Sequence, residues 1–200
     1  MTRPVFPVAR WLGVVWFAVY VPTYIVFDGL TNFLFLCDIS VLVVVFGLWS
    51  GSALLLSSQA VACPVVSTLW TLDVAWRLIT GKHLIGGTEY MWDAAVPLFA
   101  RLLSCFHAAL PLVTLGALLR TGYDRRGLWL QSGIAVAAIS AGRLVGPQAN
   151  LNYAFIDPLF KRSFGPAPLH VAVISGSLVL VVYPLTHLVL KRLFRPAATS

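Results

Sequence analysis

Charged residues are scarce in this chain. Lys, Arg, Asp and Glu make up 10% of its 200 residues, against about a quarter in ordinary globular proteins, and only 7 residues are acidic. So few charges cannot cover the surface of a soluble domain, and they also exclude a disordered chain or a coiled coil. Hydrophobic residues make up 59% and the mean hydropathy is +0.87, so the composition predicts an integral membrane protein.

Cysteine is also sparse. The three cysteines, Cys37, Cys63 and Cys105, form no CxxC pair and all fall in long apolar runs. This odd number and spacing exclude a disulfide framework and a zinc signature. No phosphate-binding glycine loop, HExxH or GxSxG motif occurs either, so we expect no metal and no cofactor.

Six apolar runs are long enough for membrane helices, which need about 20 mostly apolar residues. Their approximate ranges are 11–27, 33–49, 59–79, 93–119, 127–145 and 169–190. We therefore predict a single all-α domain over residues 1–200, a polytopic bundle of about six transmembrane helices. The first run follows Arg3 and Arg10 as in a signal peptide, but no small-residue cleavage site follows it. We interpret it as an uncleaved first span.

Basic residues set the predicted orientation. Six spans place both termini on one side, and that side carries eight Lys or Arg residues against three on the other. Because positive charge is retained in the cytoplasm, we expect both termini there, in a multi-pass protein of the cell inner (plasma) membrane. The net charge of +7 fits this topology better than nucleic-acid binding, so the expected partner is the lipid bilayer. The sequence leaves the oligomeric state open.

Ionisable side chains inside spans are costly and mark candidate functional sites. With the predicted orientation they gather in the outer half of the bundle, which favours a polar pocket that opens outward. Its predicted substrate-binding residues are Asp38, Asp73, Arg77, Arg101, Arg143, Asn150 and Asn152. The proline-rich connection over residues 146–168 is long enough to cap the bundle above this pocket.

Asp73 and Arg77 lie four residues apart, on one face of a helix, where they can pair. One interpretation is structural, with each charge neutralising the other so that the helix can insert. The other is a wall of the site in which Arg77 meets a phosphate or carboxylate of a ligand. The spacing is consistent with both.

Two residues are candidates for catalysis. His107 shares a helical face with Arg101, Ser104 and Pro111. Pro111 cannot donate to the His107 carbonyl, so we expect a kink at Pro111 that frees a carbonyl beside the imidazole. Cys37 becomes a nucleophile if His107 or an arginine generates its thiolate, which requires the second and fourth spans to touch. Asp38 can then orient His107 or pair with an arginine. The alternative is a packed, inert Cys37.

Several short motifs follow one another between about residues 33 and 190. In chain order they are LCDIS, YMWD, RLLSCFHAALP, GYDRRG, NLNYAF and YPLTHL. With these motifs in this order, the chain resembles uncharacterised bacterial multi-pass "membrane-associated proteins", a family that brings no established activity. The layout is also distantly similar to a six-helix membrane family that includes an ether-lipid acyltransferase, and to the androgen-induced hydrolases of fatty-acid esters. Those enzymes pair a Cys or Thr nucleophile with a His, which implies Cys37 as nucleophile and His107 as base here.

The leading functional hypothesis is a membrane-embedded lipid acyl hydrolase or acyltransferase, in which arginines bind a headgroup or an oxyanion. One alternative is a non-enzymatic membrane module that acts through a partner protein. A second is a carrier for a small molecule or ion, although no inverted repeat supports it. A third is haem or metal binding within the membrane, which the different predicted depths of His107 and His187 disfavour.

Overall fold

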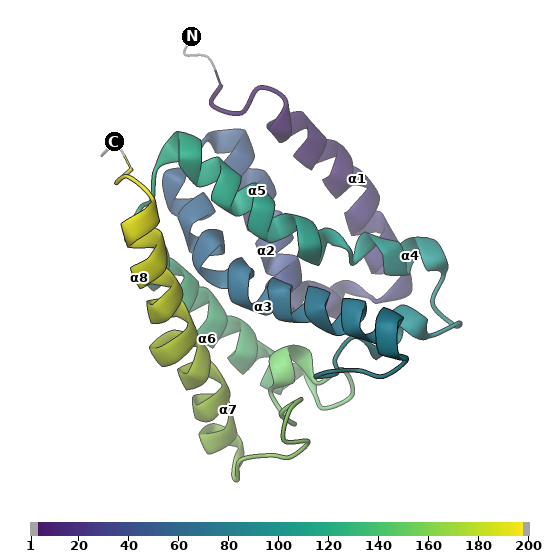
Figure 1. Ribbon diagram of the computed structural model, residues 1–200. Helices are drawn as coiled ribbons and strands as arrows, with labels where there is room; N and C mark the ends of the chain where they lie inside the picture. The colour runs from purple at the N-terminus through teal and green to yellow at the C-terminus, as the bar shows by residue number, and fades with distance from the viewer. Residues whose placement is uncertain (1–3, 198–200) are drawn as a thin grey trace.

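The computed structural model describes residues 4–197, which form six helical rods joined by three short connections and by two longer loops, residues 81–97 and 146–166 (Figure 1). The all-α prediction is confirmed, since these residues contain one isolated β-bridge and no strand. In chain order the elements are α1 (Ala9–Phe27), η1 (Leu30–Leu34), α2 (Leu36–Ser50), α3 (Ala53–Thr80), η2 (Glu89–Trp92), α4 (Leu98–Leu103), α5 (Phe106–Thr121), α6 (Gly127–Val145), η3 (Leu151–Tyr153), α7 (Ala167–Gly176), the π-helical η4 (Ser177–Val182) and α8 (Tyr183–Leu193).

Five of the rods are long and apolar enough to cross a membrane. They are α1, α3, the combined rod Leu98–Thr121, α6 and the combined rod Ala167–Leu193. The predicted second span, over residues 33–49, needs correction. Its helix, α2, has only 15 residues, or about 22 Å, which is less than the roughly 30 Å of a bilayer core. The helix starts late because η1 and the extended Phe35 occupy the first part of the apolar run.

A tight turn makes α2 and α3 an antiparallel hairpin. Gly51 ends α2 with a φ of 67°, a conformation that glycine adopts without strain. Ser52 then caps α3 by accepting a hydrogen bond from the Leu55 N–H at 3.4 Å. This cap explains why α3 begins at Ala53, several residues before the predicted start of the third span.

The fourth rod breaks at a different place from the one that Pro111 predicts. The interruption lies at Ser104 and Cys105, between α4 and α5, whereas α5 continues as a helix through Pro111. At the break, the N–H groups of His107 and Ala108 bond three residues back, to the Ser104 and Cys105 carbonyls. The observed break therefore lies nearly two helical turns before Pro111, directly beside His107.

The rods share one central helix. α3 packs against α2, α5, α6 and α8, and 50% of its most apolar stretch is buried, against 11% for α1. Gly127, at the start of α6, permits the closest approach, because a Cβ there would lie 2.8 Å from the backbone of Ser57 and Ser58 in α3. α1 is therefore the peripheral helix, and most of its surface faces outward.

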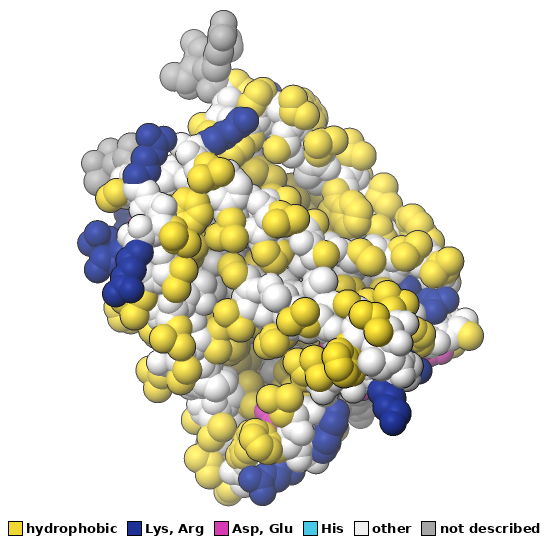
Figure 2. Space-filling model, viewed as in Figure 1, with side chains coloured by type: hydrophobic (Ala, Val, Ile, Leu, Met, Phe, Trp, Pro, Cys, Tyr) yellow, Lys and Arg dark blue, Asp and Glu magenta, His cyan; other side chains and the backbone are white. Residues whose placement is uncertain are grey.

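The bundle has two distinct ends. Both ends of the described chain lie together (Figure 1), where the Tyr123 N–H donates to the Arg195 carbonyl at 2.8 Å. We call this the terminal end, formed by residues 4–8, 50–52, 122–126 and 194–197, and the opposite one the loop end, formed by residues 28–35, 81–97 and 146–166. Figure 2 shows hydrophobic side chains over most of one face, with Lys and Arg gathered toward its ends, as expected for a bundle that spans a bilayer.

Candidate functional site

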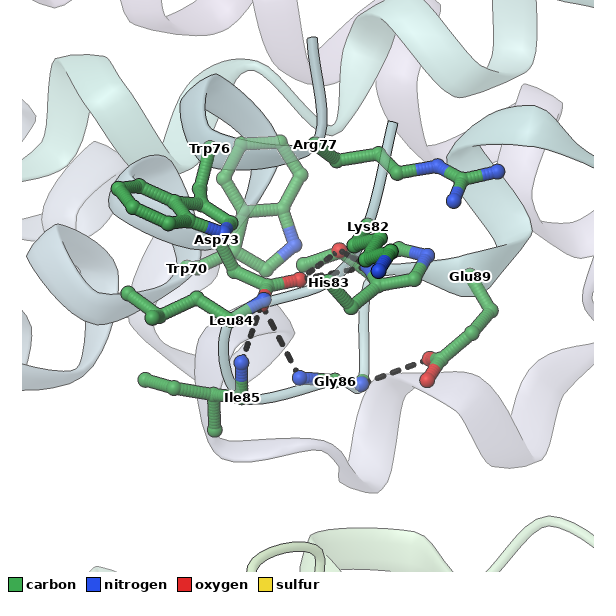
Figure 3. Close-up of polar contacts among 12 residues, drawn as sticks. Trp70, Asp73, Trp76, Arg77, Lys82, His83, Leu84, Ile85, Gly86 and Glu89 are labelled. Carbon is green, nitrogen blue, oxygen red and sulfur yellow. Dashed lines mark hydrogen bonds and ion pairs between the residues drawn. The ribbon is translucent and has the colours of Figure 1, made fainter. Parts of the chain in front are cut away.

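The carboxylate of Asp73 organises the loop between α3 and α4 (Figure 3). Its Oδ2 accepts a hydrogen bond from the Thr88 hydroxyl and lies 2.9 Å from His83 Nδ1. Asp73 is 1% exposed, so these partners replace water completely. Its Oδ1 accepts hydrogen bonds at 2.6–3.1 Å from three successive backbone N–H groups, those of Leu84, Ile85 and Gly86.

Arg77 does not pair with Asp73. Its Nη1 donates to the Gly81 carbonyl, and its guanidinium carbon lies 5.6 Å from the centroid of the Trp92 ring. Figure 3 shows the side chain extending away from the carboxylate. The ion pair predicted from the four-residue spacing is wrong. A carboxylate has about four lone-pair positions, and the donors of the loop already occupy them.

Arg143 and Arg101 each fasten a loop to a helix. Arg143 Nη1 donates to the Ala154 carbonyl at 3.1 Å, and its guanidinium carbon lies 3.9 Å from the centroid of the Phe155 ring. Arg101 Nη1 donates to the Met91 carbonyl at 2.9 Å. Arg101 Nε is buried and has no hydrogen-bond partner among residues 4–197. Of these two arginines, Arg101 therefore retains a buried N–H that a ligand can use.

Asn150 and Asn152 fold the 146–166 connection. Asn150 binds the backbone five and six residues further along the chain, at 2.8–3.1 Å. Asn152 accepts from the N–H of Leu36, the first residue of α2, at 2.8 Å and donates to the Leu34 carbonyl at 2.7 Å. Both asparagines have a positive φ, which Asn tolerates better than most residues. Asn152 thus joins this connection to the start of α2.

Asp38 links three elements near the start of α2. Its Oδ1 accepts a hydrogen bond from the Tyr20 hydroxyl of α1, and its Oδ2 accepts one from Asn32 Nδ2 of η1 at 2.8 Å. Asp38 is 2% exposed and makes no ion pair among the described residues. The expectation that Asp38 orients His107 or pairs with an arginine is therefore wrong, since two neutral donors take its oxygens.

The two loops of the loop end also touch each other. A Cβ on Gly87 would lie 2.7 Å from the Tyr153 hydroxyl, and one on Gly86 would lie 3.1 Å from Lys161 Nζ. Two surface hollows of the described residues lie elsewhere, beside α1. The structure thus places the seven predicted substrate-binding residues near one end of the bundle as expected, but each binds groups of its own chain.

His107 is fixed through one ring nitrogen. Its Nδ1 lies 2.8 Å from the Ser104 carbonyl, which can only accept, so Nδ1 carries the hydrogen and Nε2 the lone pair. The ring stacks between Trp70 and Phe106, at centroid distances of 4.5 and 4.2 Å, and is 6% exposed. Nε2 has no hydrogen-bond partner within residues 4–197. A held imidazole with an available Nε2 is suited to act as a general base.

Two tyrosine hydroxyls bind the residues that hold this imidazole. The Tyr24 hydroxyl of α1 lies 2.7 Å from the Ser104 Oγ, in the turn that binds His107. Trp70, which stacks on the imidazole, donates from Nε1 to the Tyr90 hydroxyl at 3.1 Å. The result is a polar shell under the loop end that is buried at Tyr24 and Ser104 and exposed at Tyr90.

Cys37 lies in the first turn of α2, beside Asp38, and is half-buried. No hydrogen bond joins Cys37 to His107 in the described part of the chain. The structure therefore does not pair the predicted nucleophile with the predicted base.

Sequence analysis missed a second polar cluster, nearer the terminal end. Gln59 Nε2 donates to Gln131 Oε1 at 3.1 Å, and Gln131 Nε2 donates to the Tyr183 hydroxyl at 3.3 Å. Both glutamines are buried, at 0% and 1% exposure. The expectation that nearly all the buried polarity converges on the outer half is therefore incomplete, because it did not consider the two glutamines within the helices.

Other residues of the site were also missed. Tyr20 and Tyr24 lie one helical turn apart on α1, a spacing that could have indicated a polar stripe in an apolar run. No feature of the sequence indicated that His83 and Thr88 belong to the site, because the sequence cannot show which helix their loop folds against. Among residues 4–197, no group of three or more His, Cys, Asp or Glu side chains could hold a metal ion.

Comparisons of the chain with protein families, curated proteins and solved structures find no match. Five helices are long and apolar enough to cross a membrane, which indicates an α-helical membrane protein. Anything more specific about its function has to be inferred from this chain's own residues.

Proposed function

We propose that the protein is a membrane-embedded enzyme that hydrolyses or transfers the acyl chain of a lipid, with His107 as general base and Cys37 as nucleophile. The observation that carries the proposal is the state of His107, whose Nδ1 is held by the Ser104 carbonyl while Nε2 stays available. A fixed tautomer is what a base needs in order to take a proton at one defined atom.

The proposed reaction has two steps. In the first, His107 Nε2 takes the proton of the Cys37 thiol, and the thiolate attacks the ester carbonyl carbon. The ester C–O bond then breaks, and His107 returns the proton to the leaving alcohol. In the second, water or an acceptor alcohol loses a proton to Nε2 and attacks the acyl thioester, which releases a fatty acid or a new ester. The sulfur leaves as a thiolate and regains the proton.

Substrate binding has to bring the two groups together in this mechanism. Catalytic hydrogen bonds often tighten only when substrate is bound, so we expect the Cys37 thiol to come within hydrogen-bond reach of Nε2 in the complex. Arg101 supports the proposal through its buried Nε, which has no partner among the described residues. A buried cationic donor is suited to an ester oxyanion or a headgroup phosphate.

The proposed location follows from charge. By sequence, eight Lys or Arg residues belong to the side of the two termini and three to the loops of the opposite side, so the positive-inside tendency favours the terminal end for the cytoplasm of a plasma membrane. The loop end, with His107 and Cys37 beneath it, then faces outward. The lipid substrate would enter from the outer leaflet.

A non-catalytic membrane module that acts through a partner protein is the second candidate. The observation that favours it is that all seven predicted substrate-binding residues are bonded to the chain itself, as Asp73 and Asn152 illustrate. In that case the polar shell stabilises the loop end and no bond of a lipid is broken.

Detection of the acyl-enzyme separates these candidates. The purified full chain is mixed with phospholipid that carries a radiolabelled acyl chain, and protein-bound label and free fatty acid are both measured. We expect label that neutral hydroxylamine releases, as a thioester requires. Cys37→Ala abolishes the label, and the matched variant Cys105→Ala, at an exposed free cysteine, retains it.

His107→Gln tests the base. We expect label to appear at least about 100-fold more slowly, since general bases typically contribute 10²–10⁴-fold. The matched control is His187→Gln, because His187 is bonded to Tyr123 at the terminal end and is far from the proposed chemistry. Unchanged labelling in Cys37→Ala or His107→Gln contradicts the mechanism. A folded wild-type chain that turns over no lipid supports the non-catalytic module.

A further inference from the structure

An apolar groove runs beside α1 at the terminal end, remote from His107. Its volume of about 380 Å³ falls in the range of roughly 300–1,000 Å³ that is typical of ligand sites. The lining comes from the first turns of α1 and the residues before it, the end of α2 and the second half of α5, and includes Leu12, Leu48, Leu112, Val113, Gly116 and Arg120.

The groove exists because α1 separates from α5. α1 packs against α2 and, near the loop end, against α4. Figure 1 shows α1 diverging from α5 toward the terminal end. Gly116 faces this space, since a Cβ there would meet no atom within 4 Å. Leu12 and Leu112, on the two sides, are 65% and 74% exposed, so the groove opens to the surroundings of the bundle and is apolar along its length.

A cationic group closes the groove at the terminal end. The exposed Arg120 is held by one nitrogen, Nη1, which donates to the Val5 carbonyl at 3.1 Å. Arg195 lies beside it, with Nη2 3.3 Å from the Arg120 carbonyl. No carboxylate pairs with Arg120 or Arg195 among residues 4–197.

The terminal end is predominantly cationic. Its one acidic residue, Asp124, is already paired with Arg126 at 2.8 Å. Its other basic residues are Arg125 and Arg195, and Arg10, Arg120, Lys191 and Arg192 lie in the adjoining helical turns. An apolar groove with an arginine at its mouth, on a cationic end of a membrane bundle, is complementary to an acyl chain joined to an anionic headgroup.

We propose that this groove binds an anionic phospholipid, with one acyl chain between α1 and α5 and the headgroup phosphate on Arg120. The lipid fills the space between the two helices and attaches the peripheral α1 to the bundle. This site is separate from the proposed catalytic region at the loop end, so either proposal can fail without the other.

Native mass spectrometry of the purified full chain tests the site. The chain in mild detergent receives equimolar dioleoylphosphatidylglycerol, which is anionic, and dioleoylphosphatidylcholine, which is zwitterionic and has the same acyl chains. We expect the first bound lipid to be phosphatidylglycerol, by about fivefold, since one arginine near anionic lipid contributes on the order of that factor. Arg120→Gln should remove this preference, whereas the matched Arg192→Gln, exposed on α8, should retain it.

Gly116→Leu tests the acyl groove. The new side chain enters open space, so we expect the chain to fold with an unchanged thermal midpoint and to lose phosphatidylglycerol binding by at least about tenfold. Gly133→Leu is the matched control, because Gly133 also faces open space but lies on α6. Equal lipid binding by the two glycine variants overturns the proposal. Displacement of the lipid by glycerol phosphate alone also overturns it, since that result indicates an anion site without an acyl groove.

Discussion

Removal of the Asp73 carboxylate is the sharpest test of how the loop end is held. The Asp73→Ala variant leaves three backbone N–H groups without an acceptor, all of which now bond to Oδ1 at 3.1 Å or less. It also removes the carboxylate partner of the Thr88 hydroxyl and of His83 Nδ1, which then have only each other, at 3.1 Å. No other carboxylate lies within ion-pair distance of His83 in the described residues.

The magnitude follows from the stranded donors. A buried donor without a partner costs about 1–3 kcal/mol. Allowing water to reach some of the freed groups, we expect Asp73→Ala to lower the free energy of unfolding by about 4 kcal/mol. At roughly 2–4 °C per kcal/mol for a chain of this size, the thermal midpoint should fall by about 8–16 °C. Asp73→Asn keeps one acceptor oxygen for the backbone and should lose about half as much.

The protein carries its own reporter for a thermal unfolding assay. Cys63 is a free thiol, 3% exposed on α3, and a thiol-reactive dye gains fluorescence as heating exposes it. Arg77→Gln is the control, because a simple ion pair predicts that it matches Asp73→Ala. The structure predicts less than about 1 kcal/mol for it, since Arg77 contacts the Gly81 carbonyl and the Trp92 ring. A midpoint for Asp73→Ala within about 2 °C of wild type, or an equal loss in Arg77→Gln, refutes this reasoning.

Three more predictions use the same thermal assay. Asn152→Asp replaces a buried N–H donor by an oxygen that faces two carbonyl oxygens, and it should cost about 3 kcal/mol, so an unchanged midpoint contradicts the bonds of this side chain. Gly127→Ala forces a Cβ within 2.8 Å of the α3 backbone and should cost about 1–3 kcal/mol. Gly133→Ala enters open space and should gain up to about 1 kcal/mol, and the reverse order would be inconsistent with this packing. The Arg126 side chain lowers the pKa of Asp124, so its stabilisation is present above about pH 4 and is lost as pH falls through the lowered pKa. The wild-type midpoint should therefore fall more than that of Asp124→Asn between about pH 5 and about pH 2, and equal falls would exclude this linkage.

The sequence predicted the class of fold and most of the helices, but the start of α2 shows its limit. Residues 33–49 form one apolar run, and nothing in the run marks Phe35 as extended. The break is instead set by Asn152, more than a hundred residues away, which binds the Leu36 N–H. A local sequence pattern cannot predict a contact between residues so far apart in the chain.

The candidate site also combines features that the sequence predicted with features that only the fold decided. The sequence placed Asp73 near one end of the bundle, and the four-residue spacing suggested Arg77 as its partner. The structure gives Asp73 the backbone of residues 84–86, because the loop folds back over the end of α3. His107 was found from the sequence as a buried ionisable group, but its fixed tautomer depends on the helix break at Ser104, which the sequence placed at Pro111.

The sequence by itself determined that this chain belongs in a membrane and where its long helices run. Transfer into a bilayer depends mainly on the length and apolarity of each segment, and both can be read from the order of residues. Only the tertiary structure decided which groups the buried polar residues bind and where α1 leaves an open groove. Hydrogen bonds are short and directional, so their partners depend on how distant segments meet in space.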